Sequence, residues 1–355
     1  MRSVYINLKI VYGNLYYIKI FTKINILKNQ LKLLDCTLRD GGYYNNWEFS
    51  EKLINKYLVA IDKAGIDIVE LGFRNFDEKK YYGACAYTRD SFIETLKIPK
   101  NLNIAIMINA SDIVNKDKKI ILKYFKKKIQ SKINIIRIAT HYKELGLLKN
   151  TIKILKKLGY KIYLNLMQIS ERSSEEIKNV GKFATTNKVN VLYFADSLGS
   201  LKSEEISNII KLLKVNWSGE LGIHTHDNLS RATLNTKIAQ EQGVNYIDCT
   251  VNGMGRGPGN AKTELLIFEY QKQIKKKIDP IPLLNLVENE FKKLKEKYNW
   301  GTNPFYYIAG LKKIHPTFIQ TMLSDNRFTN DDILSTMNYI SAIDGTKFNR
   351  KLIYS

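Results

Sequence analysis

Short apolar runs alternate with amphipathic segments along most of the chain beyond residue 30. Eight of these runs are apolar almost without interruption, which is typical of parallel strands that are buried on both faces. They lie at 32–38, 66–72, 103–109, 133–139, 161–167, 190–196, 220–226 and 245–251. Helical patterns lie between them, for example at 51–65 and 143–159, and several end in a glycine just before the next strand, as at Gly65, Gly159 and Gly243.

Eight strand–helix units over roughly 240 residues predict an α/β fold, the (β/α)8 TIM barrel, which needs eight parallel strands and about 250 residues. A doubly wound open sheet is the competing architecture, and the regular count of eight favours closure. We expect an N-terminal extension at 1–30, a TIM-barrel catalytic domain at 31–278 and a C-terminal helical region at 279–355.

The charge of the chain changes this picture little. Its 355 residues carry a formal net charge of +22, mainly from Lys, and an apolar content of 44% that is ordinary for a globular protein. The densest basic runs, at 116–128, 271–277 and 291–297, have apolar residues at helical spacing, so they are interpreted as solvated helix faces. We expect no nucleic-acid partner. The alternative, a non-catalytic nucleic-acid-binding protein, would leave the polar strand ends described below without a purpose.

The cysteines and the apolar runs indicate the cellular compartment in which the protein is expected. Cys36, Cys85 and Cys249 are far apart and odd in number, which argues against a disulfide framework and against a thiolate zinc site. No apolar run approaches the ~20 residues of a membrane helix. Lys is scattered through the first 30 residues, which are therefore not interpreted as a signal peptide. We expect a reduced, cytoplasmic protein with no membrane partner.

Polar side chains gather where the predicted strands end, which is where a TIM barrel holds its active site. His224 and His226 stand two residues apart on the seventh strand, so both face one side and can bind one divalent cation. The alternative is that one imidazole caps a helix and the other packs. Asp40 is the candidate carboxylate ligand because strands one and seven are near neighbours in a closed barrel. The spacing allows Mn²⁺, Mg²⁺, Fe²⁺, Co²⁺ or Zn²⁺, and a site with a carboxylate and no thiolate favours the harder ions.

Arg39, beside Asp40, fits a substrate carboxylate or an enolate oxygen, and its alternative role is an ion pair with Asp35 or Glu70. The glycine-rich loop 253–259 follows the eighth strand. Such a loop presents amide donors to an anion, forms a mobile lid or is a plain tight turn. The remaining polar residues at the strand ends are candidates for substrate binding: Glu70, Arg137, Thr140, Asp196 and Asn252.

Three motifs carry a family likeness: LLDCTLRDGG at 33–42, GIHTHDN at 222–228 and DCTVNGMGRGPGNAKTE at 248–264. In this order they resemble the superfamily of metal-dependent pyruvate aldolases, HMG-CoA lyases and isopropylmalate/homocitrate synthases. Within it, the segments 135–143 and 300–323 look most like the 4-hydroxy-2-oxovalerate aldolase branch.

The resemblance implies a TIM barrel and a divalent metal, usually Mn²⁺ or Mg²⁺. Asp40, His224 and His226 match the family's metal ligands, Asn260 matches a further ligand of the lyase branch, and Arg39 matches the arginine that stabilises the enolate. The implied activity is an aldolase that cleaves or forms a 4-hydroxy-2-oxo acid through a pyruvate enolate. Its partners would be a small 2-oxo acid and an aldehyde, and its assembly a homo-oligomer. The alternative is an acyl-CoA-dependent 2-oxo acid synthase of the isopropylmalate/homocitrate type.

The chain departs from every branch at the proton-transfer group. The histidine that follows Arg-Asp-Gly in the aldolases, the Glu-Gln of the synthases and the catalytic cysteine of the lyases are all missing from the matching positions. Tyr43, Tyr44 and His141 are the predicted replacements, with Tyr306 and Tyr307 of the C-terminal region as further candidates. A tyrosine would need a lowered pKa to act near neutral pH.

Overall fold

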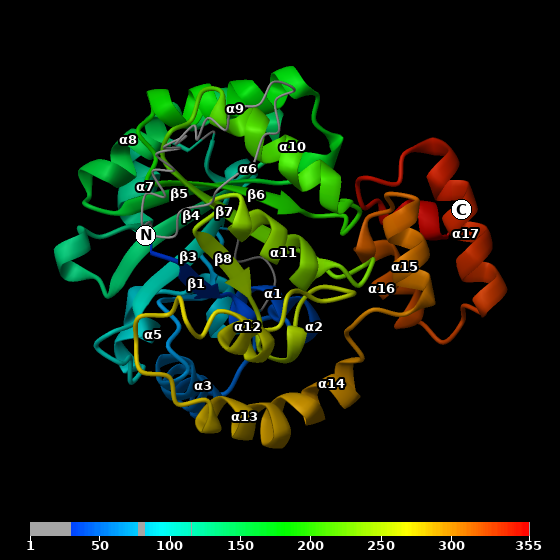
Figure 1. Cartoon of the computed structure of the whole chain (residues 1–355), viewed down its shortest axis with the longest axis horizontal. Helices are drawn as coiled ribbons and strands as arrows, with labels where there is room; N and C mark the ends of the chain where they lie inside the picture. The colour runs from blue at the N-terminus through cyan, green and yellow to red at the C-terminus, as the bar shows by residue number, and fades with distance from the viewer. Residues whose placement is uncertain (1–29, 77–81, 115, 355) are drawn as a thin grey trace, which may run out of the picture. The chain divides into compact units, whose positions relative to one another are not determined.

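The computed structural model describes residues 30–76, 82–114 and 116–354, so the predicted extension at 1–30 lies almost entirely outside the described residues. From Leu31 onward the chain forms one compact unit. Eight parallel strands close into a barrel in chain order, with β8 next to β1, which confirms the predicted TIM barrel (Figure 1). They are β1 (Lys32–Asp35), β2 (Ile68–Phe73), β3 (Asn103–Asn109), β4 (Ile133–Thr140), β5 (Lys161–Leu166), β6 (Val191–Asp196), β7 (Glu220–Thr225) and β8 (Tyr246–Cys249).

Helices follow the strands and surround the barrel, as the alternating patterns predict (Figure 1). The α-helices are α1 (Thr37–Asp40), α2 (Gly42–Asn45), α3 (Glu51–Lys63), α4 (Ala84–Tyr87), α5 (Asp90–Thr95), α6 (Ala110–Ile113), α7 (Lys118–Tyr124), α8 (Lys149–Lys157), α9 (Ser174–Thr186), α10 (Ser203–Lys214), α11 (Ala232–Glu241) and α12 (Thr263–Glu269). Short 3₁₀ turns join some of them: η1 (Lys128–Gln130), η2 (Tyr142–Leu148), η3 (Ile169–Glu171) and η4 (Val251–Gly253).

Beyond α12 the described chain is helical, as the absence of strand patterns predicts. Its elements are α13 (Ile281–Leu286), the π-helical turn η5 (Val287–Phe291), α14 (Lys292–Tyr298), α15 (Pro304–Leu311), α16 (Pro316–Leu323), α17 (Asn330–Ile343) and η6 (Arg350–Ile353). The last three α-helices and η6 bury a small apolar core of their own, which includes Tyr306, Ile314, Phe318, Met337 and Ile353. The predicted boundary between 278 and 279 stays a prediction.

The first strand ends three residues earlier than predicted, whereas the bounds of the other strands agree within two residues. The Asp35 carboxylate explains the difference, because it accepts hydrogen bonds from the backbone N–H (2.9 Å) and the hydroxyl (2.5 Å) of Thr37 and turns the chain into α1. Tyr57 of α3 and Thr263 of α12 also donate to Asp35. This buried carboxylate therefore fixes the one-turn helix that carries Arg39 and Asp40.

The interior of the barrel is filled by a layer of mostly apolar side chains, which includes Leu34, Ile68, Ala105, Ile135, Tyr163, Val191 and Tyr193. Successive residues of a strand alternate between its two faces, so the next inward position lies two residues closer to the carboxyl end. On four strands that position is polar and buried: Glu70, Arg137, Asn165 and Asp248. The barrel thus changes from apolar to polar just below its mouth.

The C-terminal helices lie against the loops that follow β5, β7 and β8. Several hydrogen bonds join the two parts, among them those of Gln168 Nε2 to the Thr346 carbonyl, Asn228 Nδ2 to the Tyr306 carbonyl, Trp300 Nε1 to the Asn252 carbonyl, and Gly257 N–H to Gln320 Oε1. In a TIM barrel these loops surround the active site. The helical region therefore adds side chains to the mouth of the barrel.

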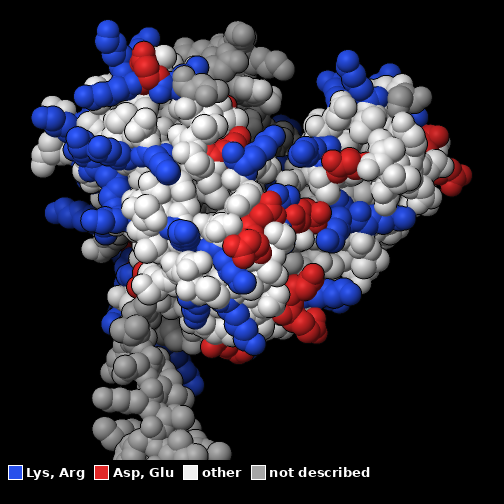
Figure 2. All heavy atoms as spheres, turned by 90° about the horizontal axis from the view of Figure 1, so that it is seen from above, with Lys and Arg blue, Asp and Glu red and all other residues white. Residues whose placement is uncertain are grey.

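Two surface features bear on partners. None of the described helices has the length and the apolar character that crossing a membrane requires. On the face that Figure 2 shows, Lys and Arg side chains project singly and in small groups, and Asp and Glu side chains lie among them. In the basic run 116–128, Lys118, Lys119 and Lys123 are exposed while Ile121 and Phe125 are buried, which favours the interpretation of this run as a solvated helix face.

Candidate metal centre

Six side chains form a closed ring of contacts at the mouth of the barrel: Arg39, Asp40, His224, Asp248, Arg137 and Glu70. They come from α1 and from β2, β4, β7 and β8, and none is more than 5% exposed. Sequence analysis named every member except Asp248. An acidic residue within an otherwise apolar strand run was the signal that could have identified it.

The metal-ligand candidates occupy one side of the ring. Asp40 Oδ2 lies 3.3 Å from His224 Nε2 and 3.8 Å from His226 Nε2, so one carboxylate oxygen faces both imidazoles. Asn260 Nδ2 lies 3.2 Å from His224 Nε2 and donates to the Thr225 carbonyl at 3.0 Å. The structure therefore brings together all four predicted ligands, although they lie up to 220 positions apart in the chain.

Partners behind the two imidazoles determine which nitrogen faces the site. His226 Nδ1 donates to the Asp196 carbonyl at 3.0 Å, and His224 Nδ1 donates to Asp248 Oδ2 at 2.9 Å. Each ring is held by its Nδ1 proton, so its Nε2 lone pair points toward Asp40. Histidines that bind metals are usually oriented in this way by a carboxylate or a backbone carbonyl.

Several polar atoms in this cluster have no hydrogen-bond partner among the described residues, namely Asp40 Oδ2, His226 Nε2, Asn260 Oδ1 and Arg39 Nη2. The first three carry lone pairs, and unpaired buried acceptors are costly unless a ligand satisfies them. A carboxylate, two imidazoles and an amide oxygen form a donor set that divalent cations accept. These residues therefore fit a divalent metal.

The charges of the ring also fit a cation. Two guanidinium groups face three carboxylates, which leaves one negative charge in excess when His224 is neutral. Burial lowers the pKa of His224, but its contacts with Asp248 and Asp40 outweigh burial and raise that pKa, which shows that the site favours a positive charge between these carboxylates. Burial raises the pKa of Asp40, but Arg39 and the imidazoles outweigh it and hold the pKa well below the ordinary range, so the carboxylate stays ionised. Burial also lowers the pKa of His226 to about 3, and His224 and Arg256 act in the same direction, so the imidazole stays neutral.

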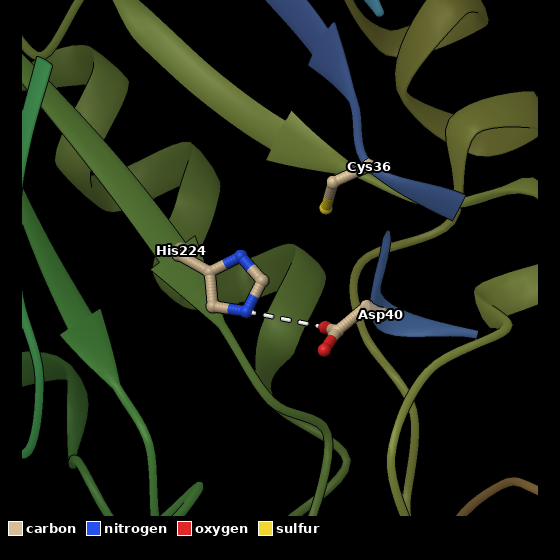
Figure 3. Close-up of side chains that lie close together, drawn as sticks. All are labelled: Cys36, Asp40 and His224. Atoms are coloured by element: carbon tan, nitrogen blue, oxygen red, sulfur yellow. Dashed lines mark ion pairs between the residues drawn. The ribbon is translucent and has the colours of Figure 1, made fainter. Parts of the chain in front are cut away.

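Cys36 lies at the base of the same cluster. Possible ligand atoms of Cys36, Asp40 and His224 lie within 4.8 Å of one another (Figure 3). Sequence analysis argued against a thiolate ligand, and this stays a prediction. Burial raises the pKa of the Cys36 thiol well above its ordinary value. The thiol donates weakly to the Cys249 carbonyl at 3.5 Å, and the predicted preference for harder ions is unchanged.

The other side of the ring holds Arg39. Its Nε donates to Glu70 Oε2 at 2.8 Å and its Nη1 donates to Asp40 Oδ1 at 2.7 Å. Of the two ion pairs that the sequence allowed, the pair between Arg39 and Glu70 is therefore the one that forms, and Asp35 does not pair with Arg39. Arg137 donates to Asp248 at 2.6 Å and lies 3.2 Å from Glu70, which it helps to hold. Glu70 and Asp40 thus orient the Arg39 guanidinium, and its Nη2 group has no partner among the described residues.

A cluster of apolar side chains borders Arg39. Phe73, Met107 and Ala139 pack with Trp47 and Met167, and the Arg39 guanidinium lies 5.9 Å from the centre of the Phe73 ring. Apolar walls lower the local dielectric constant, which strengthens the interaction of Arg39 with a bound anion.

The glycine-rich loop allows the ligands to approach closely. A Cβ on Gly255 would lie 1.8 Å from Asn260 Oδ1 and 3.4 Å from Asp40 Oδ2, so Gly255→Ala must displace the Asn260 side chain. We expect the affinity for Mn²⁺ to fall about 10–100-fold, the size of effect seen when a support of a metal ligand is removed. Titration followed by the electron paramagnetic resonance of free Mn²⁺ measures it.

Gly146→Ala is the matched control for that substitution. A Cβ on Gly146 meets no atom within 4 Å, so the same change should leave Mn²⁺ affinity unaltered. Equal affinity in the Gly255→Ala variant and the wild-type protein would show that Asn260 is not a ligand in the arrangement described here.

Three predicted substrate-binding residues already have partners within the protein. The Asp196 carboxylate accepts from the backbone N–H groups of Ser200 and Leu201, and the Thr140 hydroxyl donates to the His141 carbonyl. Asn252 adopts a positive φ of 53° and accepts from Trp300 through its carbonyl. These contacts shape the loops around the site, and the substrate-binding role of the residues stays a prediction.

The predicted proton-transfer groups differ in their surroundings. Burial raises the pKa of Tyr43, and it raises the pKa of Tyr44 to about 12, so neither tyrosine has the lowered pKa that the sequence interpretation required. The Tyr44 hydroxyl donates to the Gly257 carbonyl at 3.2 Å and packs the loop. Burial lowers the pKa of His141, at the end of β4, so its imidazole is neutral at pH 7.

Comparisons with known proteins agree with this geometry. The sequence model of the HMGL-like family matches residues 30–288. A curated relative from Pelotomaculum thermopropionicum, named 4-hydroxy-2-oxovalerate aldolase, is 27% identical over 246 residues, which are 68% of this chain and 70% of that protein. A relative of the same name from Carboxydothermus hydrogenoformans is 27% identical over 253 residues, with 69% and 72% covered.

A solved structure is similar over a larger part of the chain. The N-terminal domain of a "putative aldolase" from Bacteroides vulgatus has a TM-score of 0.76 and 32% sequence identity, and the match covers 86% of this chain and 99% of that domain. An HMG-CoA lyase from Bacillus subtilis has a TM-score of 0.63 at 15% identity, with 77% and 95% covered, and this likeness concerns the fold alone.

Proposed function

The chain belongs to the HMGL-like family, and on that basis we propose that it is a divalent-metal-dependent carbon–carbon lyase, an aldolase that cleaves or forms a 4-hydroxy-2-oxo acid through a pyruvate enolate. The observation that carries the proposal is the cluster of unpaired lone pairs on Asp40, His226 and Asn260 next to the free Nη2 group of Arg39. A 2-oxo acid needs both a cation for its carbonyl oxygen and a donor for its negative charge.

Asp40, His224, His226 and Asn260 would hold the metal, with Mn²⁺ or Mg²⁺ as the preferred ion because all four offer hard or borderline donors and no thiolate takes part. A bound divalent cation would supply Lewis-acid stabilisation of the enolate oxygen. Asp248 and the Asp196 carbonyl keep the two imidazoles in the correct tautomer. The chain's own contribution is thus a preorganised set of buried ligands.

Arg39 would bind the carboxylate of the 2-oxo acid through Nη2. Glu70 and Asp40 hold the other nitrogens of the guanidinium, so the group needs no reorientation when a substrate arrives. His141 is the group that we propose for proton transfer, since a neutral imidazole accepts a proton near pH 7 and the tyrosines do not. In the direction of synthesis, His141 would take a proton from the methyl group of pyruvate.

The experiment that tests this function is the exchange of the pyruvate methyl protons in D₂O, followed by proton NMR. We expect exchange with the wild-type protein and Mg²⁺ or Mn²⁺, and none after removal of the metal with a chelator. Arg39→Ala should lower the exchange rate about 10²–10³-fold, the effect of losing one preorganised donor to a developing oxyanion.

A folded, metal-loaded protein that catalyses no exchange would overturn the aldolase proposal. The alternative function, the acyl-CoA-dependent synthase, would then be tested by the release of free CoA from acyl-CoA and 2-oxo acid pairs. The proposed partners are a small 2-oxo acid and an aldehyde. The homo-oligomer and the cytoplasmic location remain predictions from sequence.

A further inference from the structure

The fourth histidine of the chain, His315, belongs to the C-terminal helical region but lies near the mouth of the barrel. It precedes α16, whose first turn packs on the loop after β8. Pro316 lies 3.1 Å from the position that a Cβ on Gly257 would take, and Gln320 accepts the Gly257 N–H at 3.2 Å. Asn260, a proposed ligand, belongs to the same loop. Sequence analysis gave His315 no role, because nothing in its local pattern indicates the barrel.

Hydrogen bonds hold the His315 ring in one tautomer. Its Nδ1 accepts the backbone N–H of Thr317 at 3.3 Å, and since an amide N–H only donates, Nδ1 carries the lone pair. The neutral ring therefore has its proton on Nε2. The backbone of His315 donates to the Gly345 carbonyl at 2.8 Å, and the Phe348 ring lies 6.5 Å from the imidazole. The side chain is thus fixed with Nε2 as a donor.

The surroundings keep this imidazole neutral. Burial lowers the pKa of His315 well below its ordinary value, and Arg256 lowers it further, as would His226 and His141 if they carried a proton. These three residues come from the loop after β8 and from the ends of β7 and β4. The contacts of Pro316 and Gln320 with Gly257 place the start of α16 beside the same loop. A position before the first turn of a helix also disfavours a positive charge.

We propose that His315 Nε2 donates a hydrogen bond to the oxygen of the aldehyde half of the substrate. The inference rests on the proposed function, and it concerns the one substrate oxygen that Arg39 and the metal ligands leave without a partner. A neutral donor is suited to this place because it binds an oxygen that gains negative charge without giving up its own proton.

The proton and electron balance of the step is simple. In synthesis, the methyl carbon of pyruvate loses a proton to His141 and its electron pair forms the new bond to the aldehyde carbon. The carbonyl π pair moves onto the aldehyde oxygen, where His315 stabilises it, and that oxygen then takes the proton back from His141. Cleavage follows the same path in reverse.

Two substitutions of His315 separate its donor from its role at the start of α16. An Asn side chain places its amide near the position of Nδ1 and keeps the bond to Thr317, because Asn is a good N-cap residue. A Gln side chain reaches to the position of Nε2 and offers an N–H donor there. Thr329→Asn makes the corresponding change before α17, where Thr329 caps the helix far from the proposed reaction, and serves as the control.

Two reactions of each Mg²⁺- or Mn²⁺-loaded variant are compared. One is methyl exchange of pyruvate in D₂O, which involves no aldehyde. The other is addition of pyruvate to the aldehyde that the wild-type protein uses fastest among acetaldehyde, propanal, benzaldehyde and glycolaldehyde. We expect His315→Asn to lower the addition rate about 10²-fold and to leave exchange unchanged, because one oxyanion donor has an effect of that size. His315→Gln should restore most of the addition rate.

Equal losses of exchange and addition in His315→Asn would overturn the inference, since they would indicate a general structural role. So would unchanged addition. A wild-type protein that catalyses no metal-dependent exchange would instead overturn the proposed function, and the two failures are therefore distinguishable.

Discussion

Asp40→Asn is expected to remove Mn²⁺ binding and to slow metal-dependent exchange of pyruvate protons by about 10³-fold, because a Lewis acid contributes several kcal/mol to enolate stabilisation. Asp40 Oδ2 is the oxygen that faces both His224 Nε2 and His226 Nε2, and the substitution replaces one carboxylate oxygen with an N–H donor. The free protein should remain folded, since the new amide can donate to His224 Nε2. Mn²⁺ titration and NMR exchange measure the two effects.

The same chemical change on the surface provides the control. Asp331 lies exposed in the first turn of α17, so Asp331→Asn should alter neither Mn²⁺ affinity nor exchange. The gain in melting temperature that Mn²⁺ gives the wild-type protein should disappear in Asp40→Asn only, because the gain depends on binding to the folded state. Mn²⁺ affinity of Asp40→Asn within a factor of three of the wild type would mean that Asp40 is not a ligand.

Of the substitutions proposed for this protein, Arg137→Met is expected to lower stability most, by about 3–5 kcal/mol in the free energy of unfolding. Arg137 is completely buried, pairs with Glu70 and Asp248, and stacks on the Tyr193 ring at 4.4 Å. Met retains part of the packing but removes the cation that two buried carboxylates share, so Glu70 depends on Arg39 and Asp248 depends on His224. Urea denaturation at neutral pH measures the change.

A second variant distinguishes lost charge from lost packing. Glu70→Gln combined with Arg137→Met neutralises one of the two buried carboxylates that pair with Arg137, so it should recover part of the lost stability. Lys56→Met breaks an ion pair with Glu290 on the surface and should change stability very little, since such pairs are screened by solvent. If Arg137→Met and Lys56→Met had equal effects, the ring would not contribute to stability as a buried ionic network.

Much of the fold follows from local patterns. Strands buried on both faces have continuous apolar runs, and a strand–helix alternation repeated eight times closes most readily into a barrel. The position of the site follows as well, because every strand of a TIM barrel delivers its carboxyl end to the same face. His224 and His226 share a face through the two-residue period of a strand, which does not depend on any distant contact.

The exceptions depend on distant contacts. β1 ends earlier than predicted because Asp35 accepts hydrogen bonds from Thr37, and Tyr57 of α3 and Thr263 of α12 hold the Asp35 carboxylate in place for them. The pKa of Tyr44 rises because other parts of the chain bury it, whereas the sequence interpretation required a fall. Asp248 was missed because its partner Arg137 is 111 residues away.

The sequence by itself determined the barrel, its helical C-terminal region and the residue types at the strand ends, because these depend on short-range periodicity and on the common direction of parallel strands. Only the tertiary structure decided that six side chains close into an ionic ring, that Arg39 pairs with Glu70, and that His315 reaches the barrel mouth. Burial and charge at a point in space are sums over residues that are far apart in the chain, and no local pattern contains those sums.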